Sequence, residues 1–325
     1  MFPSNGLMTV LFLSFSFVLF ASFKESLSAQ SASYLEAQRR YQKGEYLAAM
    51  LAAQKAVQED GNNPQYRHIY GSALVEMKQF TEAEENLRKA VVLDPSNAEF
   101  VYSLGALLLQ QKIETAISQQ LRSGVKRPRA WLIDAEGVKL LEQAVALEPN
   151  HLKARLHLGR AYYEQNRHDR AMQQFENVVK RDPRYPWVHS HIAVIHMNAG
   201  AVQAAIRELK TELQLHPNHA SARMDLGDAF LKAAQPRLAL EQFLAAAEQN
   251  PEVSEQASWH YGLAKTYRDL GQAEKAINAL RRCTTIDPNF PDAHYLLGRL
   301  YQETGQPDLS RQESEKFQRL KLATQ

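Results

Sequence analysis

The sequence predicts an all-α protein, a solenoid of about eight helix-turn-helix repeats that occupy residues 30–324. One glycine position recurs along the chain, at steps of 34, 54, 68 and 71 residues, which are one period of 34, one period plus 20, two periods, and two periods plus three. This position, the repeat mark, is held by Gly71, Gly105, Gly159, Gly227 and Gly298. Ala37, Ala193 and Ala264 occupy the missing steps, so each repeat has a small residue there.

The same phase predicts further small residues and a stop in each repeat. Twelve residues after the mark, allowing for 20 extra residues in the third repeat, stand Ala49, Ala83, Gly137, Ala171, Ala205, Ala239, Ala276 and Ser310. Seven residues further on, most repeats again have a small residue, and Glu212 and Phe317 depart from this rule. Six repeats close with Pro95, Pro149, Pro183, Pro217, Pro251 and Pro288, and Gly61 closes the first. Small residues let two antiparallel helices cross closely, and proline ends the second helix.

These marks divide the chain into eight helix pairs. The predicted repeats span residues 30–63, 64–97, 98–151, 152–185, 186–219, 220–256, 257–290 and 291–324. Apolar residues at helical spacing, as in Leu158, Gly159 and Tyr162, give the first helix of each repeat one buried stripe. The third repeat contains a 20-residue insertion near 111–131, whose apolar spacing predicts that its first helix continues for about three more turns.

The pattern resembles the tetratricopeptide repeat (TPR) family, of the exported bacterial type, over about nine-tenths of the chain. The matching residues are Pro95, Leu104, Gly105 and Leu108; Leu158, Gly159, Tyr162, Ala171, Phe175 and Pro183; and Leu226, Gly227, Phe230, Ala239, Phe243 and Pro251. The resemblance implies a right-handed α-solenoid, or superhelix, whose first helices line a concave groove. It also implies a non-catalytic scaffold that binds proteins or peptides there.

Composition narrows the range of partners. The net charge is +2, so no global field favours nucleic acid, and none is expected as a partner. The single cysteine, Cys283, can form no disulfide within the chain. Eleven histidines include His189, His191 and His196, but no zinc-binding motif contains them. No catalytic motif is present, and we expect no enzyme activity, no cofactor and no metal.

The first residues differ from the rest of the chain. From Leu7 to Phe23 runs an uncharged apolar stretch of 17 residues, which is the length of a signal-peptide core and marginal for a membrane span. Residues 1–29 are therefore expected to be a signal peptide, and the protein periplasmic or secreted. The alternative is an uncleaved N-terminal membrane anchor.

The groove positions that the family pattern implies are rich in tyrosine. The candidate binding residues are Tyr102, Lys153, Arg160, Tyr163, Trp187, Tyr261, Lys265, Arg268, Tyr295 and Arg299. Rigid aromatic rings with a polar group suit recognition, although each tyrosine could instead pack between adjacent first helices. Lys265, Arg268 and Arg299 are expected to converge and to bind an acidic partner.

The insertion offers a second candidate contact. Its basic cluster consists of Arg122, Lys126, Arg127 and Arg129 and ends at Trp131. These residues either form a solvated loop or contact an acidic partner or anionic membrane headgroups. Apart from the N-terminal segment, this is the one place where we expect membrane contact. Two functions remain open: a protein- or peptide-binding scaffold of the cell envelope, or a groove that binds an anionic polysaccharide in an export or assembly system.

Overall fold

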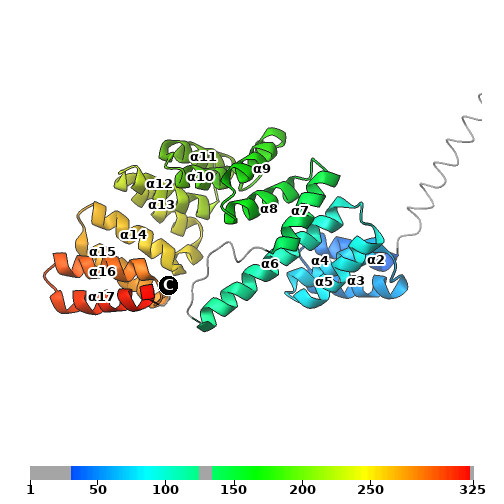
Figure 1. The fold of residues 1–325 in the computed structure, drawn as a ribbon, viewed down its shortest axis with the longest axis horizontal. Helices are drawn as coiled ribbons and strands as arrows, with labels where there is room; N and C mark the ends of the chain where they lie inside the picture. Colours follow the sequence, from blue (N-terminus) through cyan, green and yellow to red (C-terminus); the bar gives the residue numbers. More distant parts are fainter. Residues whose placement is uncertain (1–30, 124–133, 323–325) are drawn as a thin grey trace, which may run out of the picture. The chain divides into compact units, whose positions relative to one another are not determined.

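The structure, a computed structural model, describes residues 31–123 and 134–322 (Figure 1). This part of the chain forms sixteen α-helices and one short 3₁₀-helix, and it contains no strand. The prediction of an all-α solenoid of helix pairs is confirmed.

The chain divides into two compact units, Met1–Leu108 and Leu109–Gln325, called unit 1 and unit 2. The helices of unit 1 are α2 (Ala32–Gln42), α3 (Tyr46–Glu59), α4 (Pro64–Glu76) and α5 (Phe80–Leu93), followed by the start of α6 (Ala98–Ser123). Unit 2 holds the rest of α6 and then α7 (Ala135–Leu147), α8 (Leu152–Glu164), α9 (His168–Arg181), α10 (Val188–Asn198), α11 (Val202–Leu215), α12 (Ala220–Lys232), α13 (Pro236–Gln249), η2 (Pro251–Glu255), α14 (Ala257–Asp269), α15 (Ala273–Ile286), α16 (Pro291–Glu303) and α17 (Pro307–Leu322).

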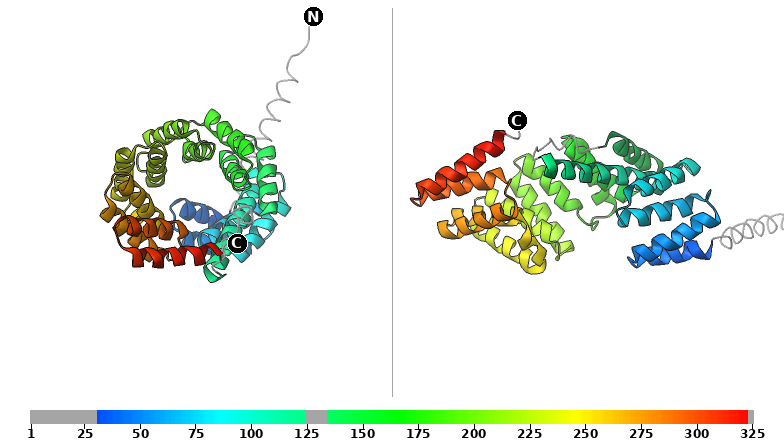
Figure 2. Two further views of the ribbon diagram at one scale, coloured as in Figure 1. Left: turned by 60° about the vertical axis from the view of Figure 1, so that its left-hand side comes forward. Right: turned by 90° about the horizontal axis from the view of Figure 1, so that it is seen from below.

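Within unit 2 the helices form two layers. Each first helix packs on the second helix of its own pair, and each second helix packs on the next first helix. The successive first helices α8, α10, α12 and α14 also contact one another, whereas no two successive second helices of unit 2 approach to the same extent. The first helices are therefore the inner layer of a curved stack, which Figure 2 shows from two further directions. The residues that this layer exposes are the natural candidates for a groove.

The marks lie where two helices of one pair cross most closely. A methyl group added to Gly159 would come within 2.5 Å of the Phe175 ring, and one added to Gly71 within 2.7 Å of Leu87. The small residues twelve positions after the mark are buried as predicted, with Ala83, Ala171 and the equivalent alanines fully inaccessible. Small residues here thus permit the helix pairs to close.

The turn between successive repeats and the turn inside each helix pair both recur at fixed positions relative to the mark. The second helices end two residues before each closing proline, as predicted: α9 ends at Arg181 before Pro183, and α15 at Ile286 before Pro288. The turn inside each pair has a residue in the left-handed conformation seven positions after the mark. In the described repeats these residues are Gly44, Lys78, Asn166, Gly200, Ala234, Gly271 and Gly305.

The two irregular spacings have different structural outcomes. Helix α6 contains 26 residues and continues to Ser123, twice the length of α8 with its 13 residues, so the first helix of the third repeat does run on. The three residues that lengthen the sixth repeat are accommodated by the 3₁₀-helix η2 directly before α14. The remainder of the insertion, 124–133, lies outside the described residues.

Candidate functional site

The predicted groove residues of unit 2 lie on the exposed side of the first helices. Lys153 and Arg160 on α8 are exposed to solvent, as is Arg299 on α16. Trp187, at the start of α10, and Tyr295 on α16 are each about half exposed, at 50% and 49%. Tyr102, on the part of α6 that belongs to unit 1, is partly buried and makes interactions of its own.

Most of the predicted aromatic residues contact a neighbouring helix. The Tyr163 hydroxyl on α8 accepts a hydrogen bond of 2.7 Å from the Asn198 side chain at the end of α10. The Tyr261 ring lies 5.0 Å from that of Phe290 and the Tyr295 ring 5.3 Å from that of Phe317. The contacts of Tyr163 and Tyr261 reach the next first helix or its N-cap residue and favour packing between adjacent first helices. Tyr295 instead contacts the second helix of its own pair.

Trp187 has an unusual backbone and an unusual support. It has a φ of 72°, a left-handed conformation that is costly for a bulky residue. Its backbone N–H donates to Glu212 Oε1 at 3.0 Å, and its ring packs edge-on against His219 at 3.9 Å. Glu212, which departs from the small-residue rule, is fully buried and also faces His219 Nδ1 at 3.0 Å. Burial alone would raise the pKa of Glu212, but the hydrogen bonds from His219 and Trp187 bring it below its ordinary value. The carboxylate is therefore a structural anchor for this turn.

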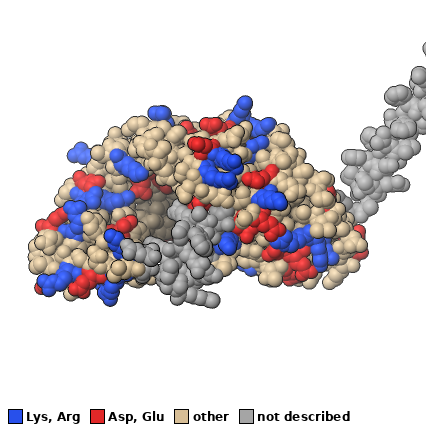
Figure 3. All heavy atoms as spheres, in the orientation of Figure 1, with Lys and Arg blue, Asp and Glu red and all other residues tan. Residues whose placement is uncertain are grey.

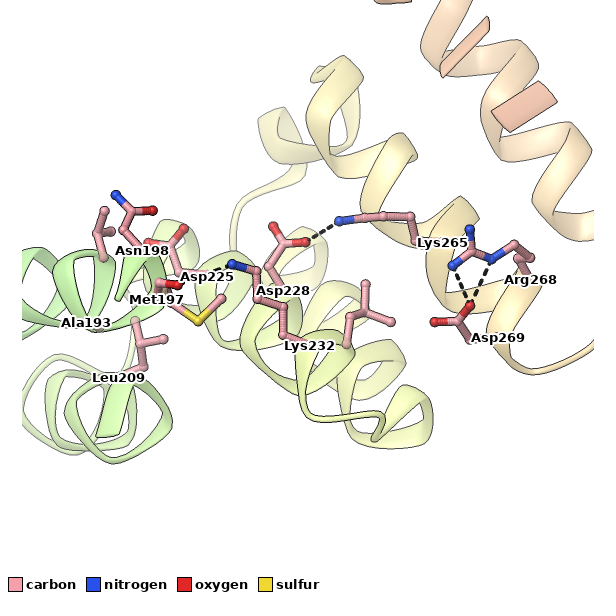
Figure 4. Close-up of a pocket in the computed structure, with 12 residues that line it drawn as sticks. Ala193, Met197, Asn198, Leu209, Asp225, Asp228, Lys232, Lys265, Arg268 and Asp269 are labelled. Carbon is pink, nitrogen blue, oxygen red and sulfur yellow. Dashed lines mark hydrogen bonds and ion pairs between the residues drawn. The ribbon is translucent and has the colours of Figure 1, made fainter. Parts of the chain in front are cut away.

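A pocket of about 500 Å³ opens on the first helices α10, α12 and α14, with α11 beneath it (Figure 4). Its walls come from the residues Ala193, Val194, Met197, Asn198, Leu209, Asp225, Asp228, Leu231, Lys232, Lys265, Arg268 and Asp269. Apolar side chains from α10, α11 and α12 form one part of the lining, and six charged side chains form the other. The volume lies within the range of roughly 300–1,000 Å³ that is usual for ligand pockets.

The charged groups of this pocket, here called the α12 pocket, are mostly paired. Lys265 Nζ lies 2.7 Å from Asp228 Oδ1, an ion pair between α14 and α12. Arg268 lies 2.7 Å from its neighbour Asp269. Lys232 donates to the Met197 carbonyl oxygen at 3.4 Å, close to the C-terminal end of α10. Burial and the nearby Asp228 raise the pKa of Asp225 to about 6.

The structure thus unites only two of the three basic residues expected to converge. Lys265 and Arg268 line the α12 pocket, whereas Arg299 does not line it and pairs with Glu303 at 3.3 Å. Each of the three faces a carboxylate, so they do not form the unbalanced positive cluster that the sequence suggested. On the face shown in Figure 3, basic and acidic side chains are likewise interspersed. Nothing in the sequence pattern predicted that Asp228 would pair with Lys265.

Sequence reasoning missed Asp225, Lys232 and Asp269. Asp225 stands two residues before the mark Gly227, a phase at which other repeats have residues such as Leu296. A charge at this phase was the one signal that could have identified it. Lys232 is the last residue of α12, and Asp269 is the last residue of α14, directly after the predicted groove residue Arg268.

The histidines and the cysteine have structural explanations. His189 uses both ring nitrogens, Nδ1 facing Glu208 at 2.7 Å and Nε2 facing the Pro183 carbonyl at 3.1 Å. His191 stacks on Phe175, and burial lowers its pKa to about 4. Burial raises the pKa of Cys283 to about 12, so it is not a reactive thiolate. Over residues 31–123 and 134–322, no three potential metal ligands of the His, Cys, Asp and Glu types come together.

The remaining sequence candidates fall outside the described part of the chain. The basic residues Lys126, Arg127 and Arg129 and the neighbouring Trp131 lie in 124–133, and nothing is described of the Arg122 side chain in α6. The predicted signal segment lies within residues 1–30. Among the helices that the structure does describe, none combines the length and the apolar character needed to cross a membrane.

Comparisons with protein families agree with the repeat pattern. Residues 71–112 and 264–305 match the family described as TPR repeat. Families described as tetratricopeptide repeat match residues 135–190, 192–254 and 291–324. Residues 19–90 match the family described as anaphase-promoting complex, cyclosome, subunit 3.

Two curated relatives are similar over part of their length. Superkiller protein 3 of Schizosaccharomyces pombe is 23% identical over 183 residues, which are 51% of this chain and 13% of that protein. A TPR repeat-containing protein of Pseudomonas aeruginosa is 38% identical over 66 residues, 20% of this chain and 57% of that protein. The chain therefore spans less than two thirds of either relative.

Two solved structures are similar over most of this chain. The crystal structure of the APC/C hetero-tetramer Cut9-Hcn1 has a TM-score of 0.65 at 15% identity, over 85% of this chain and 50% of that one. A tetratricopeptide repeat protein from Parabacteroides merdae has a TM-score of 0.56 at 14% identity, over 84% of this chain and 100% of that one. At these identities the likeness concerns the fold.

Proposed function

Because the chain belongs to the tetratricopeptide repeat proteins, we propose that it is a non-catalytic scaffold that binds a partner protein or peptide on its inner layer of first helices. Adjacent first helices expose side chains to the same side, so one extended segment could contact several repeats at once. Fold alone does not define a ligand, and the site must carry the argument.

The observation that carries this proposal is the α12 pocket. It is a hollow of ligand size on the first helices of three successive repeats, and it combines apolar walls with charged groups. Val194, Met197 and Leu231 provide apolar contact area there, and an ion pair between Lys265 and Asp228 connects α14 with α12. A protein segment bound in this place would bury apolar surface and keep hydrogen bonds at its rim.

The pairing of charges makes the polysaccharide alternative weaker. An anionic polymer would need several unpaired cations along the groove, and Lys265, Arg268 and Arg299 each lie next to a carboxylate. The polymer would have to compete with these ion pairs. A protein partner, which can offer apolar and charged groups together, suits the mixed lining better.

We further propose that the scaffold acts in the cell envelope. This proposal rests on the apolar run from Leu7 to Phe23. Residues 1–33 fused to alkaline phosphatase, which is active only after export, should give phosphatase activity in a bacterial host. Absence of activity, with the fusion retained in the cytoplasm, would contradict an envelope location. If the activity sediments with membranes and the fusion keeps Met1, the segment is an anchor and is not cleaved.

Photo-crosslinking tests the binding surface. The photoreactive residue p-benzoylphenylalanine would replace Leu231, which lines the pocket, or Leu244, which is 48% exposed on the second helix α13. Illumination of the full chain in an extract of its host should yield a discrete adduct from the Leu231 variant and not from the Leu244 variant. Mass spectrometry then identifies the partner. Equal adducts from both positions, or none from Leu231, would contradict binding on the inner layer.

A further inference from the structure

Of the three carboxylates that line the α12 pocket, Asp225 is the one without a basic partner among the described residues. Two of the three carboxylates have a basic partner within the pocket, Asp228 with Lys265 and Asp269 with Arg268. Asp225 has no hydrogen bond and no ion pair with any residue that the structure describes, and it is partly withdrawn from solvent. A carboxylate in such a setting gains most from a cation brought to it.

The remaining cation of the pocket does not fill this role. Lys232 is exposed on the last turn of α12, and its ammonium donates to the Met197 carbonyl oxygen, where a helix C-terminus favours positive charge. It makes no ion pair within 4.0 Å among the described residues. In Figure 4 its amino group is directed toward Met197.

We propose that the α12 pocket binds a lysine or arginine side chain of a partner protein, with Asp225 as the acceptor of its charge. The aliphatic stem of such a side chain would pack against Val194, Met197 and Leu231, which line the same pocket. An acidic side chain would meet the carboxylate of Asp225 and would have to displace Asp228 or Asp269 from their basic partners. The pocket therefore selects a basic segment, in contrast to the acidic partner that the sequence suggested. This inference rests on the proposed scaffold function.

Asp225 also provides a pH signature for the site. Its pKa is raised to about 6 by burial and by Asp228, so much of it is protonated at pH 5 and most is ionised at pH 7. Only the ionised form attracts a cation, and affinity for a basic segment should thus increase with pH. Several titratable or charged groups surround Asp225. On α12 and directly before it these are Asp228, Lys232 and His219, and on α14 they are Lys265, Arg268 and Asp269. The residues of α10 and α11 that line the pocket do not titrate.

The test uses the full chain and four fluorescent peptides of nine residues. Each is built from Ser, Ala and Leu, is acetylated and amidated, and has Lys, Arg, Gln or Glu at the centre. Fluorescence anisotropy should show that the Lys and Arg peptides bind at least about tenfold more tightly than the Gln peptide, and that the Glu peptide binds most weakly. Affinity for the Lys peptide should rise up to about tenfold between pH 5 and pH 7, as the ionised fraction of a group with a pKa near 6 requires.

Two variants assign the effect to one carboxyl group. Asp225→Asn keeps the shape of the side chain and should lose both the preference for the Lys and Arg peptides and the rise of affinity between pH 5 and pH 7. Glu241→Gln removes an equal charge from the exposed side of α13 and should behave as the wild type. If Asp225→Asn does not fold, carbon-13 NMR of the wild-type carboxyl groups provides the same test. The pKa of Asp225 should then fall when N-acetyl-lysine methylamide is added.

Several results would overturn the inference. Tightest binding of the Glu peptide would show that the basic residues, and not Asp225, select the partner. Equal binding of the Lys and Gln peptides would show that charge plays no part, and binding of cadaverine as tight as that of the Lys peptide would point to a free diamine. If any of these occurs while Leu231 still crosslinks to a partner, the scaffold function stands and only the charge assignment is wrong.

Discussion

At the residue scale, a single methyl group determines which side chains fit where the two helices of a pair cross. In four repeats of unit 2 the size of the residue at the mark is complementary to that of the residue sixteen positions later, although in unit 1 Gly71 faces a leucine, Leu87. Phe175 and Phe243 face the glycines Gly159 and Gly227, whereas Leu209 and Leu280 occupy the same position in repeats whose marks are Ala193 and Ala264. A large ring on the second helix thus requires a glycine on the first, because the ring occupies the space that a methyl group at the mark would need.

This complementarity predicts opposite signs for one substitution made at two marks. Gly159→Ala should destabilise by about 1–3 kcal/mol, since the new Cβ would lie 2.5 Å from Phe175 and the ring must move. Gly298→Ala meets no atom closer than 3.4 Å and should stabilise by about 0.5–1 kcal/mol through its better helix propensity. Equilibrium urea unfolding measures both changes in the free energy of unfolding.

A compensating change provides the control for this prediction. Phe175→Leu in the Gly159→Ala background recreates the pairing of Ala193 with Leu209 and should recover part of the loss. Stabilities that are equal for Gly159→Ala and Gly298→Ala would mean that the crossings are not at the predicted marks.

At the element scale, the turn inside each helix pair repeats one capping geometry. The residue after the left-handed position donates its backbone N–H to the carbonyl five residues earlier, as Gln235 does to Phe230 and Gln272 to Tyr267. This bond is the 6→1 bond of the Schellman motif. Glycine is the residue best suited to the left-handed position, and four of the seven described repeats have it there.

Ala234 is one of three residues other than glycine at this position, with Lys78 and Asn166, and it offers a stabilising change. It has a φ of 54°, where an alanine Cβ is strained. Ala234→Gly should raise the free energy of unfolding by about 1 kcal/mol, somewhat reduced by the greater freedom of glycine in the unfolded chain. Ala233→Gly, one residue earlier at a φ of −82°, removes a methyl group without relieving strain and should not stabilise. A thermal melt that shows both variants less stable than the wild type would contradict the turn geometry.

A second recurrent set of hydrogen bonds stabilises the turn between repeats. In five repeats, a basic residue four positions before the mark bonds to the carbonyl of the residue six positions earlier and to a side chain nineteen positions later. The described pairs with that later side chain are Arg67 with Asn86, Arg155 with Gln174, His189 with Glu208, Arg223 with Gln242, and His294 with Glu313. In these five pairs arginine faces an amide and histidine faces a carboxylate. His260 stands at the same phase but has Ala279 nineteen positions later, so it forms no such pair.

The pair of His189 and Glu208 should make stability depend on pH. The hydrogen bond to Glu208 raises the pKa of His189 above its ordinary value. Its stabilising effect is therefore complete below the unfolded pKa of about 6.5 and is lost as the pH rises through the folded value. The double variant His189→Arg with Glu208→Gln copies the pair formed by Arg155 and Gln174 and should lack this dependence.

Urea unfolding of both proteins at pH 6 and pH 9 tests the pair. The wild type should lose stability relative to the double variant at the higher pH. Parallel curves would mean that His189 is neutral in the fold at both values. His168→Gln, outside the pair, serves as the control for histidine content.

At the scale of the whole molecule, the sequence was sufficient wherever a feature repeats. The marks, the buried alanines and the prolines are dictated by local packing and by backbone chemistry that each repeat must satisfy again. The left-handed turn position was visible too, because Gly44, Gly200, Gly271 and Gly305 share one phase. The turn position was not predicted, because three other described repeats have a different residue there.

The pocket could not be predicted in the same way. Lys265 and Asp228 are 37 residues apart, and their ion pair depends on the stacking of two first helices across the 3₁₀-helix η2. Asp225 occupies a phase held by residues as different as Leu35, His191 and Leu296, so its partial exposure depends on the shape of this particular hollow. Features found in one repeat only are beyond an argument from periodicity.

The last prediction concerns how damage spreads through the chain. In a solenoid each repeat is stabilised mainly by its neighbours, so a lost core side chain should weaken nearby repeats and leave distant ones folded. Phe243, in unit 2, and Leu87, in unit 1, are each only 1% exposed. Phe243→Ala should cost about 3–5 kcal/mol and Leu87→Ala about 2–5 kcal/mol. Amide hydrogen exchange followed by mass spectrometry should show faster exchange in α12 to α15 for the first variant and in α4 and α5 for the second. Uniform loss of protection over both units would instead mean that the chain unfolds as one cooperative body, and that the nearest-neighbour description does not hold.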